Sequence, residues 1–254
     1  METKILEVKN LKKVYNKGKT STQALADISF DVTEGEIFGI LGPNGAGKST
    51  TLHILIGLLT PSSGSVKIFG KNFFEHEEEI KTKMNIATAY AELAQNLTVY
   101  QNLKVFAHLY GVKNYKKKIE DLLEQFQITD LRDERIDRLS AGQKTRINLC
   151  KSLINDPEFL LLDEPTASLD PAIAAHVRAM FLEIQKKRKL TIIFTSHNMP
   201  EVEQMCDRVA LLNKGKIYKI DTPKNLQKFL EVPTMEEVFI KLASGDLTNE
   251  EHND

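Results

Sequence analysis

Four short runs of apolar residues mark the chain, and polar or turn-forming residues bound each of them. The runs are Ile37–Leu41, residues 159–162, residues 190–194 and residues 209–212. Short and nearly continuous apolar runs are typical of strands that are buried on both faces of a parallel sheet. The pattern therefore predicts a parallel sheet with helices between its strands.

A second pattern alternates apolar and polar residues. It covers residues 4–8, 26–32 and 65–69. Alternation with a period of two residues indicates strands with one buried face. We expect these three segments to form a small antiparallel lobe.

The middle third of the chain, residues 97–155, changes to a helical period. One apolar face contains Tyr115, Ile119, Leu122, Leu123 and Phe126, and another contains Leu103, Phe106 and Tyr110. Such spacing is typical of amphipathic helices. This part of the chain is therefore predicted to be a helical lobe, whereas the polar and acidic residues 244–254 are predicted to be a disordered tail.

Composition narrows the classes of protein that fit. Among 254 residues, 34 Lys and Arg nearly balance 35 Asp and Glu, so no overall field favours nucleic acid or an anionic membrane as a partner. The two cysteines, Cys150 and Cys206, have no metal-like spacing, which fits a reducing compartment. No apolar run approaches the length of a membrane span, so we expect any membrane to be crossed by another chain.

A candidate phosphate-binding loop directly follows the run Ile37–Leu41. Its residues are Gly42, Pro43, Asn44, Gly45, Ala46, Gly47, Lys48, Ser49 and Thr50. Glycines let successive backbone N–H groups turn toward one ligand, Lys48 supplies a charge for the β- and γ-phosphates, and Ser49 offers a hydroxyl to Mg²⁺. A helix that starts near Ser49 adds its positive dipole end. The spacing predicts a nucleotide-binding site.

Two carboxylates, Asp163 and Glu164, follow the apolar run at residues 159–162. Successive residues of a strand point to opposite sides, so the pair can divide its work. We expect Asp163 to hold Mg²⁺ and Glu164 to accept a proton from an attacking water. A strand that simply ends in solvated charge is the alternative.

Two further side chains are candidates for ligand contacts. His197 follows the apolar run at residues 190–194, where open α/β sheets place ligands, and could donate a hydrogen bond to a γ-phosphate. Tyr15 precedes the phosphate loop and could stack on a base. A surface histidine and a packing tyrosine are the alternatives for these two residues.

A glycine-containing segment at residues 139–143 opens an amphipathic stretch. Ser140 is a good N-cap for a helix there, followed by Gly142 and Gln143. A capped helix with a flexible glycine explains these residues adequately from the sequence alone.

In their order and spacing, these motifs resemble the ATP-binding-cassette ATPase family. The resemblance rests on Tyr15 and His197 and on residues 42–50, 139–143, 162–165 and 167–170. It implies an α/β fold: a P-loop NTPase (RecA-like) core with an antiparallel β subdomain and an inserted helical subdomain. The expected domain covers residues 1–230, with the helical subdomain at about 90–155 and a C-terminal extension at 231–254.

The resemblance also implies roles for single residues. Tyr15 would stack on adenine, and Ser140, Gly142 and Gln143 would belong to the signature loop that caps the γ-phosphate bound by the opposite subunit. Two cassettes would close around two ATP molecules, with Asp170 at the seam between them. The implied cofactors are ATP and Mg²⁺, and the implied reaction is hydrolysis of ATP, with Lys48, Glu164 and His197 as its catalytic residues.

One position departs from the family pattern. The family usually has a glutamine, which contacts Mg²⁺ and the attacking water, at a position that corresponds to Ala89. Either Glu92 or Gln95 substitutes for it from a displaced loop, or the contact is missing. We expect this departure to affect the coupling of hydrolysis to a partner more than the affinity for ATP.

A single cassette of this kind resembles the detached ATPase subunit of a transporter. The implied partners are a separate transmembrane permease and a second cassette, identical or related, and no nucleic acid is expected. The chain would be cytoplasmic and peripheral, held on the membrane through the permease. Residues 233–239 resemble the ending of export-type cassettes, although an ordinary amphipathic helix is the alternative reading.

Other classes remain as alternatives. A soluble cassette ATPase that acts on DNA or the ribosome would normally carry two cassettes or a long coiled-coil insertion, and this sequence has neither. A nonenzymatic scaffold would not need Lys48, Glu164 and His197. A GTPase would be expected to carry an Asn-Lys-x-Asp segment, so ATP is preferred as the nucleotide.

Overall fold

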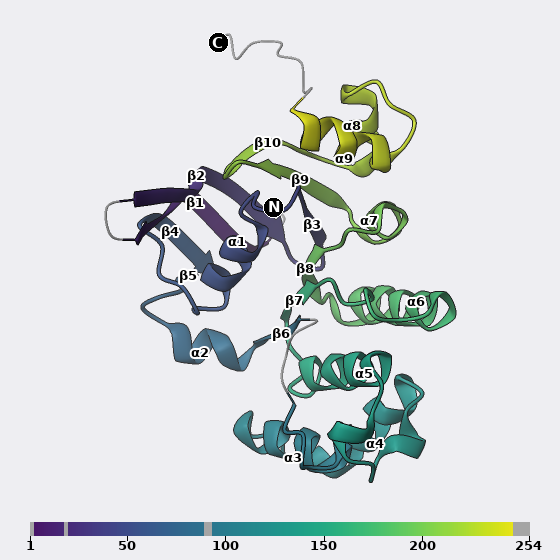
Figure 1. Ribbon diagram of the computed structural model, residues 1–254. Coiled ribbons are helices and arrows are strands. Elements are labelled where there is room, and N and C mark those ends of the chain that lie inside the picture. The colour runs from purple at the N-terminus through teal and green to yellow at the C-terminus, as the bar shows by residue number, and fades with distance from the viewer. Residues whose placement is uncertain (1–2, 18–19, 89–92, 246–254) are drawn as a thin grey trace. The chain divides into compact units, whose positions relative to one another are not determined.

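The computed structural model describes residues 3–17, 20–88 and 93–245 (Figure 1). These residues belong to two compact units. The first unit combines Met1–Glu75 with Thr195–Asp254, and the second is His76–Phe194. Each unit contains both strands and helices, which confirms the predicted α/β class. The domain limits expected near residues 90, 155 and 230 stay predictions.

A four-stranded antiparallel sheet in the first unit contains all three segments predicted for it. Its order is β2-β1-β4-β5, with β1 at Lys4–Lys17, β2 at Thr20–Thr33, β4 at Ser63–Ile68 and β5 at Lys71–Asn72. Strands β1 and β2 have 14 residues each, more than the alternation predicted. The register of this pair shifts between Val8 and Leu11, where the amide of Asn10 donates to Asp27 at 3.0 Å. Because such an irregularity resets the two-residue period, the pattern identified only part of each strand.

Three more strands of the first unit follow the order β10-β9-β3. They are β3 at Ile37–Leu41, β9 at Arg208–Asn213 and β10 at Lys216–Asp221. Strands β3 and β9 are parallel, all of β3 is buried, and β10 returns antiparallel to β9. The helices of this unit are α1 at Lys48–Leu55, α7 at Met199–Met205, α8 at Pro223–Phe229 and α9 at Met235–Ser244.

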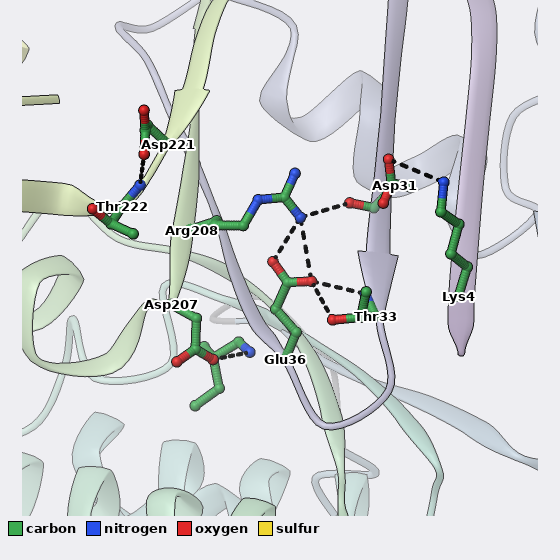
Figure 2. Close-up of polar contacts among 9 residues, drawn as sticks. Lys4, Asp31, Thr33, Glu36, Asp207, Arg208, Asp221 and Thr222 are labelled. Atoms are coloured by element: carbon green, nitrogen blue, oxygen red, sulfur yellow. Dashed lines mark hydrogen bonds and ion pairs between the residues drawn. The ribbon is translucent and has the colours of Figure 1, made fainter. Parts of the chain in front are cut away.

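An ion pair between a buried carboxylate and a partly exposed guanidinium marks the start of β3 (Figure 2). The carboxylate of Glu36 accepts hydrogen bonds from the backbone N–H of Thr33 at 2.7 Å and its hydroxyl at 3.0 Å. The guanidinium of Arg208 donates to the same carboxylate at 3.1 Å. Beside it, the carboxylate of Asp207 accepts from the N–H of Ile37 at 2.9 Å. These contacts join the end of β2 and the start of β9 to the strand that leads into the phosphate loop.

The second unit places strands in the order β6-β7-β8. They are β6 at Met84–Thr88, β7 at Phe159–Asp163 and β8 at Thr191–Thr195, and β6 and β7 are parallel. The pattern predicted β7 and β8 but not β6, in which buried Asn85 interrupts the apolar residues. The amide of Asn85 donates to the Asn155 side chain at 2.8 Å, so this polar residue is satisfied inside the unit.

The predicted helical segment contains α3 at Val99–Leu109, α4 at Tyr115–Gln125 and α5 at Ala141–Ser152, preceded by α2 at Glu77–Thr82 and followed by α6 at Pro171–Arg188. Two short 3-10 turns, at Thr129–Leu131 and Ile136–Arg138, lie between α4 and α5. Of the apolar face predicted for α4, Tyr115 is half-buried and the other four residues are buried, but on α3 the buried stripe is Val99, Leu103 and Ala107. Tyr110, predicted to share a face with Leu103, is exposed just after α3.

Asp156 joins two helices of the second unit. Its carboxylate accepts from the ammonium of Lys118 on α4 at 2.6 Å and pairs with Arg188 on α6. Burial alone raises the pKa of Asp156, but the two basic side chains outweigh burial and hold the pKa below its ordinary value of 3.8.

Within the described ranges, none of the helices combines the length and the apolarity that a bilayer crossing requires. Cys150 and Cys206 are buried as free thiols. Burial raises the pKa of both thiols, so neither is activated as a nucleophile. Of the predicted tail, residues 246–254 lie outside the described residues, and residue 244 ends α9.

Candidate functional site

The phosphate loop lies where the sequence predicts it, between β3 and α1. Strand β3 ends at Leu41 and α1 begins at Lys48, so the residues between them connect a buried strand to a helix N-terminus. The first N–H groups of a helix have no partner within it and carry its positive dipole end. This end of α1 therefore offers backbone donors to an anion.

Gly47 shapes the turn into α1. It is the N-cap of the helix and has a φ of 113°, a left-handed conformation that glycine adopts without strain. A Cβ at this position would lie 2.7 Å from the side chain of Leu25 and 2.8 Å from the carbonyl oxygen of Ala24. The backbone of the loop thus packs against β2 too closely for any side chain at residue 47.

A hairpin turn supports the phosphate loop from β9 and β10. Gly215 in that turn donates its N–H to the carbonyl of Ala46 at 2.9 Å and accepts from the N–H of Ala26 at 2.7 Å. Lys214 and Gly215 have φ values of 47° and 74°, as a two-residue hairpin turn requires. This turn connects the loop to both sheets of the first unit, and sequence reasoning did not identify it.

Lys48 and Ser49 are the two side chains of the loop that are predicted to contact phosphate and Mg²⁺. The ammonium of Lys48 donates to the carbonyls of Gly42 at 2.5 Å and Pro43 at 3.3 Å, which keeps its charge over the loop. The hydroxyl of Thr51 is buried and donates to the Gly47 carbonyl at 2.9 Å, whereas Ser49 is exposed on the first turn of α1. Ser49 is therefore the side chain of this turn that suits a cation ligand.

Tyr15 and His197 belong to the same unit as the phosphate loop. Tyr15 lies on β1 with 39% of its surface exposed, and the ammonium of Lys13 lies 5.2 Å from the centre of its ring. His197 is exposed between β8 and α7. Next to it, Ser196 donates to buried Glu201 at 2.9 Å, which fixes the backbone that carries the histidine. The base-stacking and phosphate-sensing roles of Tyr15 and His197 stay predictions.

The two candidate carboxylates lie in the second unit. Asp163 is the last residue of β7 and is half-buried, as is Glu164. Glu164 has a φ of 51°, an uncommon left-handed conformation for a residue with a side chain. Strain of this kind is concentrated at functional sites, where surrounding structure holds the residue in place. Residue type did not predict this conformation.

The predicted metal ligands are one hydroxyl, of Ser49, and one carboxylate, of Asp163. Over the described residues, no three His, Cys, Asp or Glu side chains gather as a metal cluster. A hydroxyl and one carboxylate instead match Mg²⁺, which is held by one or two carboxylates together with substrate phosphates. Ser49 in the first unit and Asp163 in the second each carry an oxygen of the kind that Mg²⁺ accepts, and their shared role as its ligands stays a prediction.

The segment at residues 139–143 begins helix α5 as predicted. The hydroxyl of Ser140 accepts from the N–H of Gln143 at 3.3 Å, and the Gln143 side chain accepts from the N–H of Ser140 at 2.8 Å. This reciprocal pair is a capping box, so Ser140 is confirmed as the N-cap and Gln143 completes the cap.

Gly142 lies against the segment that follows the carboxylates. A Cβ at Gly142 would lie 3.0 Å from the carbonyl oxygen of Ser168. Within the second unit, the start of α5 and residues 166–169 therefore touch through backbone. Asp170 ends that segment and caps α6, since its carboxylate accepts from the N–H groups of Ala172 and Ile173 at 3.1 Å each. Sequence reasoning missed this capping role, although the following Pro171 is a signal for a helix start.

The position that corresponds to the family glutamine falls in a part of the chain that the structure does not describe. Ala89 and Glu92 lie outside the described residues. The side-chain amide of Gln95 donates to the carbonyl of Leu93 at 3.1 Å. The substitution of Glu92 or Gln95 for the family glutamine stays a prediction.

Comparison with known proteins relates the chain to nucleotide-binding transport subunits. A model of the ABC transporter family matches residues 25–167, which include the phosphate loop, residues 139–143 and both carboxylates. The linearmycin resistance ATP-binding protein LnrL of Bacillus subtilis is 36% identical over 224 residues, which are 87% of this chain and 70% of that protein. A fluoroquinolones export ATP-binding protein of Mycobacterium tuberculosis is 36% identical over 225 residues, which are 89% of this chain and 73% of that protein.

A solved structure described as the ATP-binding subunit of an ABC transporter has the same fold. Its TM-score is 0.84 at 26% sequence identity, over 94% of this chain and 99% of that structure. This likeness confirms the predicted fold class, a P-loop NTPase core with an antiparallel sheet and a helical insertion.

Proposed function

The chain belongs to the ABC transporter family, and on that premise we propose that it is the ATP-hydrolysing subunit of a membrane exporter. The observation that carries this proposal is the phosphate loop: Gly47 opens helix α1 in a left-handed conformation, Lys48 lies over the loop and Ser49 is exposed beside it. Backbone donors, a fixed cation and a hydroxyl are the groups that a nucleoside triphosphate requires at its β- and γ-phosphates.

In this proposal the two carboxylates supply a metal ligand and a general base. Ser49 and Asp163 would hold Mg²⁺, which when bound neutralises negative charge on the phosphate oxygens. Glu164 would accept a proton from the water that attacks the γ-phosphate in line. Its half-buried position and its constrained backbone support this role, since a general base must be held in place. His197 would donate a hydrogen bond to the γ-phosphate, and Lys48 would stabilise the charge that develops there.

A second cassette would provide the remaining contacts. We assign Ser140, Gly142 and Gln143 to the γ-phosphate bound by the opposite subunit, with Asp170 at the seam. The exposed start of α5 supports this assignment, because its N–H groups and dipole favour an anion. The capping box holds Ser140 and Gln143 in a fixed arrangement, so this end of the helix is organised before an anion arrives. Tyr15 would stack on the adenine ring.

The proposed partner is a separate transmembrane permease, which would hold the cassette on the cytoplasmic face of the membrane. Closure of two cassettes around ATP would move the permease. Export is the proposed direction, since relatives at 36% identity are described as linearmycin resistance and fluoroquinolones export proteins. The similarity of residues 233–239 to endings of export-type cassettes agrees with that direction.

The test is the mass of Glu164→Gln in solution, with and without Mg-ATP. We expect this variant to bind ATP without hydrolysing it and to accumulate as a closed dimer, because the substitution removes the base and keeps the shape. Glu158→Gln is the matched control. Glu158 lies at the opposite end of the strand from Glu164 and is half-exposed beside Lys83.

The control variant should hydrolyse ATP at the wild-type rate and should not accumulate as a dimer. A Glu164→Gln chain that keeps the mass of a monomer in Mg-ATP, together with a wild type that hydrolyses no ATP, would contradict the proposed function.

A further inference from the structure

Helix α9 carries an aromatic side chain to the candidate phosphate-sensing histidine. The rings of His197 and Phe239 are 6.3 Å apart at their centres and lie at 80° to each other. This edge-to-face arrangement is one that aromatic rings prefer, because the edge of one ring and the face of the other carry opposite partial charge. Both residues belong to the first unit.

The helix that bears Phe239 is held at both ends. At its start, the N–H of Met235 donates to the carboxylate of Glu203 on α7 at 3.0 Å, and the same carboxylate accepts from Gln227 at 2.7 Å. At its other end, the side chain of Asn213 donates to the carbonyl of Leu242 at 2.7 Å in a buried contact. Helix α9 is therefore fixed to the end of β9 and to the helix that follows His197.

Helix α9 has a buried face and an exposed face. Met235, Val238 and Leu242 form its buried stripe, with Phe239 half-buried beside them. Ile240 points away, with 58% of its surface exposed. The stripe explains the docking of α9 without Phe239, so the aromatic ring at this position is available for its contact with the imidazole.

The terminal torsion angle of a histidine has no sharp staggered minima, so the contacts of the ring decide its orientation. A hydrogen bond to one phosphate oxygen requires one ring orientation. A neighbouring aromatic ring on an anchored helix is one such contact, and it favours one orientation before the nucleotide binds, which lowers the cost of reaching the productive arrangement.

We propose that Phe239 is a positioning residue for ATP hydrolysis, acting by orienting the imidazole of His197. The inference rests on the proposed function, since it takes His197 as the donor to the γ-phosphate. Through this contact the orientation of the imidazole depends on one side chain of helix α9. The position of α9 then sets the rate of hydrolysis without touching the nucleotide.

The experiment compares four variants of the full chain: Phe239→Leu, Phe239→Tyr, Ile240→Ala and His197→Ala. Steady-state hydrolysis gives kcat and KM, binding of a fluorescent ATP analogue gives Kd, and thermal melting verifies that each variant is folded. The imidazole resonance of His197, assigned by its loss in His197→Ala, reports the ring contact directly by nuclear magnetic resonance.

We expect Phe239→Leu to lower kcat roughly two- to tenfold, the range that one aromatic pair provides, with Kd unchanged. The His197 resonance should shift in the same variant. Phe239→Tyr keeps the ring and should restore both kcat and the resonance. Ile240→Ala, on the same helix, should change neither.

A double-mutant cycle separates positioning from general damage. In the His197→Ala background, Phe239→Leu should cause no further loss of the residual rate, because the residue acts through the imidazole. An equal loss in both backgrounds would overturn the proposal, and so would an unmoved resonance or an unchanged kcat in Phe239→Leu. A fully active His197→Ala would overturn it while ATP hydrolysis itself stands. A wild type without hydrolysis would overturn the proposed function as well.

Discussion

Replacing Glu36 with glutamine tests the ion pair that marks the start of β3. The Glu36 side chain is 6% exposed and Arg208 is 34% exposed. One carboxylate oxygen accepts from both donors of Thr33, and the other accepts from the guanidinium at 3.1 Å. Glutamine keeps the shape but places a donor group against either Thr33 or Arg208. One charged hydrogen bond is lost, and a donor faces a donor.

The expected loss follows from these contacts. A hydrogen bond to a charged group contributes about 1.5–3 kcal/mol, and breaking a fully buried pair costs about 3–5 kcal/mol. Because Arg208 is partly exposed, water replaces some of the lost contact. We therefore expect the free energy of unfolding to fall by about 1.5–3 kcal/mol, which for a chain of this size lowers Tm by roughly 4–10 °C.

Urea unfolding followed by circular dichroism measures the change at neutral pH. Asp31→Asn is the control, because the Asp31 pair with Lys4 is longer, at 3.6 Å, and both side chains are more than a third exposed (Figure 2). This control should stay within about 0.5 kcal/mol of the wild type. Equal midpoints for Glu36→Gln and Asp31→Asn would refute the reasoning that burial makes the Glu36 pair stabilising.

Three more predictions concern the second unit. Asp156→Asn should lower the free energy of unfolding at pH 7 by about 0.5 kcal/mol, since the side chain is half-exposed. The pKa of Asp156 is lowered in the folded chain, so its contribution is present above the ordinary value of 3.8 and is lost as pH falls through the folded pKa; urea midpoints for variant and wild type should converge as pH falls below 3.8, and a constant gap would contradict this. Asp170→Ala removes the cap of α6 and should cost about 0.5–2 kcal/mol in urea unfolding, whereas Asp170→Asn should keep most of it; equal losses would show that capping is not its role. Gly142→Ala brings a Cβ to 3.0 Å from the Ser168 carbonyl and should slow ATP hydrolysis while the Kd of a fluorescent ATP analogue is unchanged; a normal rate would show that this contact adjusts freely.

Local patterns in the sequence determined much of the fold. Strand β3 and the core of β7, β8 and β9 were found because strands buried on both faces are continuous apolar runs. The phosphate loop was found because its glycines, lysine and serine are contiguous. Ser140 was found because a capping residue acts on N–H groups within the same helical turn.

Local features explain why the pattern of apolar and polar residues did not predict some elements. Strand β6 contains a buried asparagine that is satisfied by residue 155, and β1 continues through irregularities that interrupt its alternation. The left-handed conformation of Glu164 has no signal in residue type, because glutamate has no preference for it.

Tertiary structure decided the contacts between distant parts of the chain. Glu36 pairs with Arg208 across 172 positions, Gly215 supports Ala46, and Phe239 meets His197. Sequence patterns report which face of an element is buried, but they do not state what buries it. The candidate phosphate loop and the strand before it are therefore encoded by contiguous residues, whereas the groups that hold them in place become neighbours only when the chain folds.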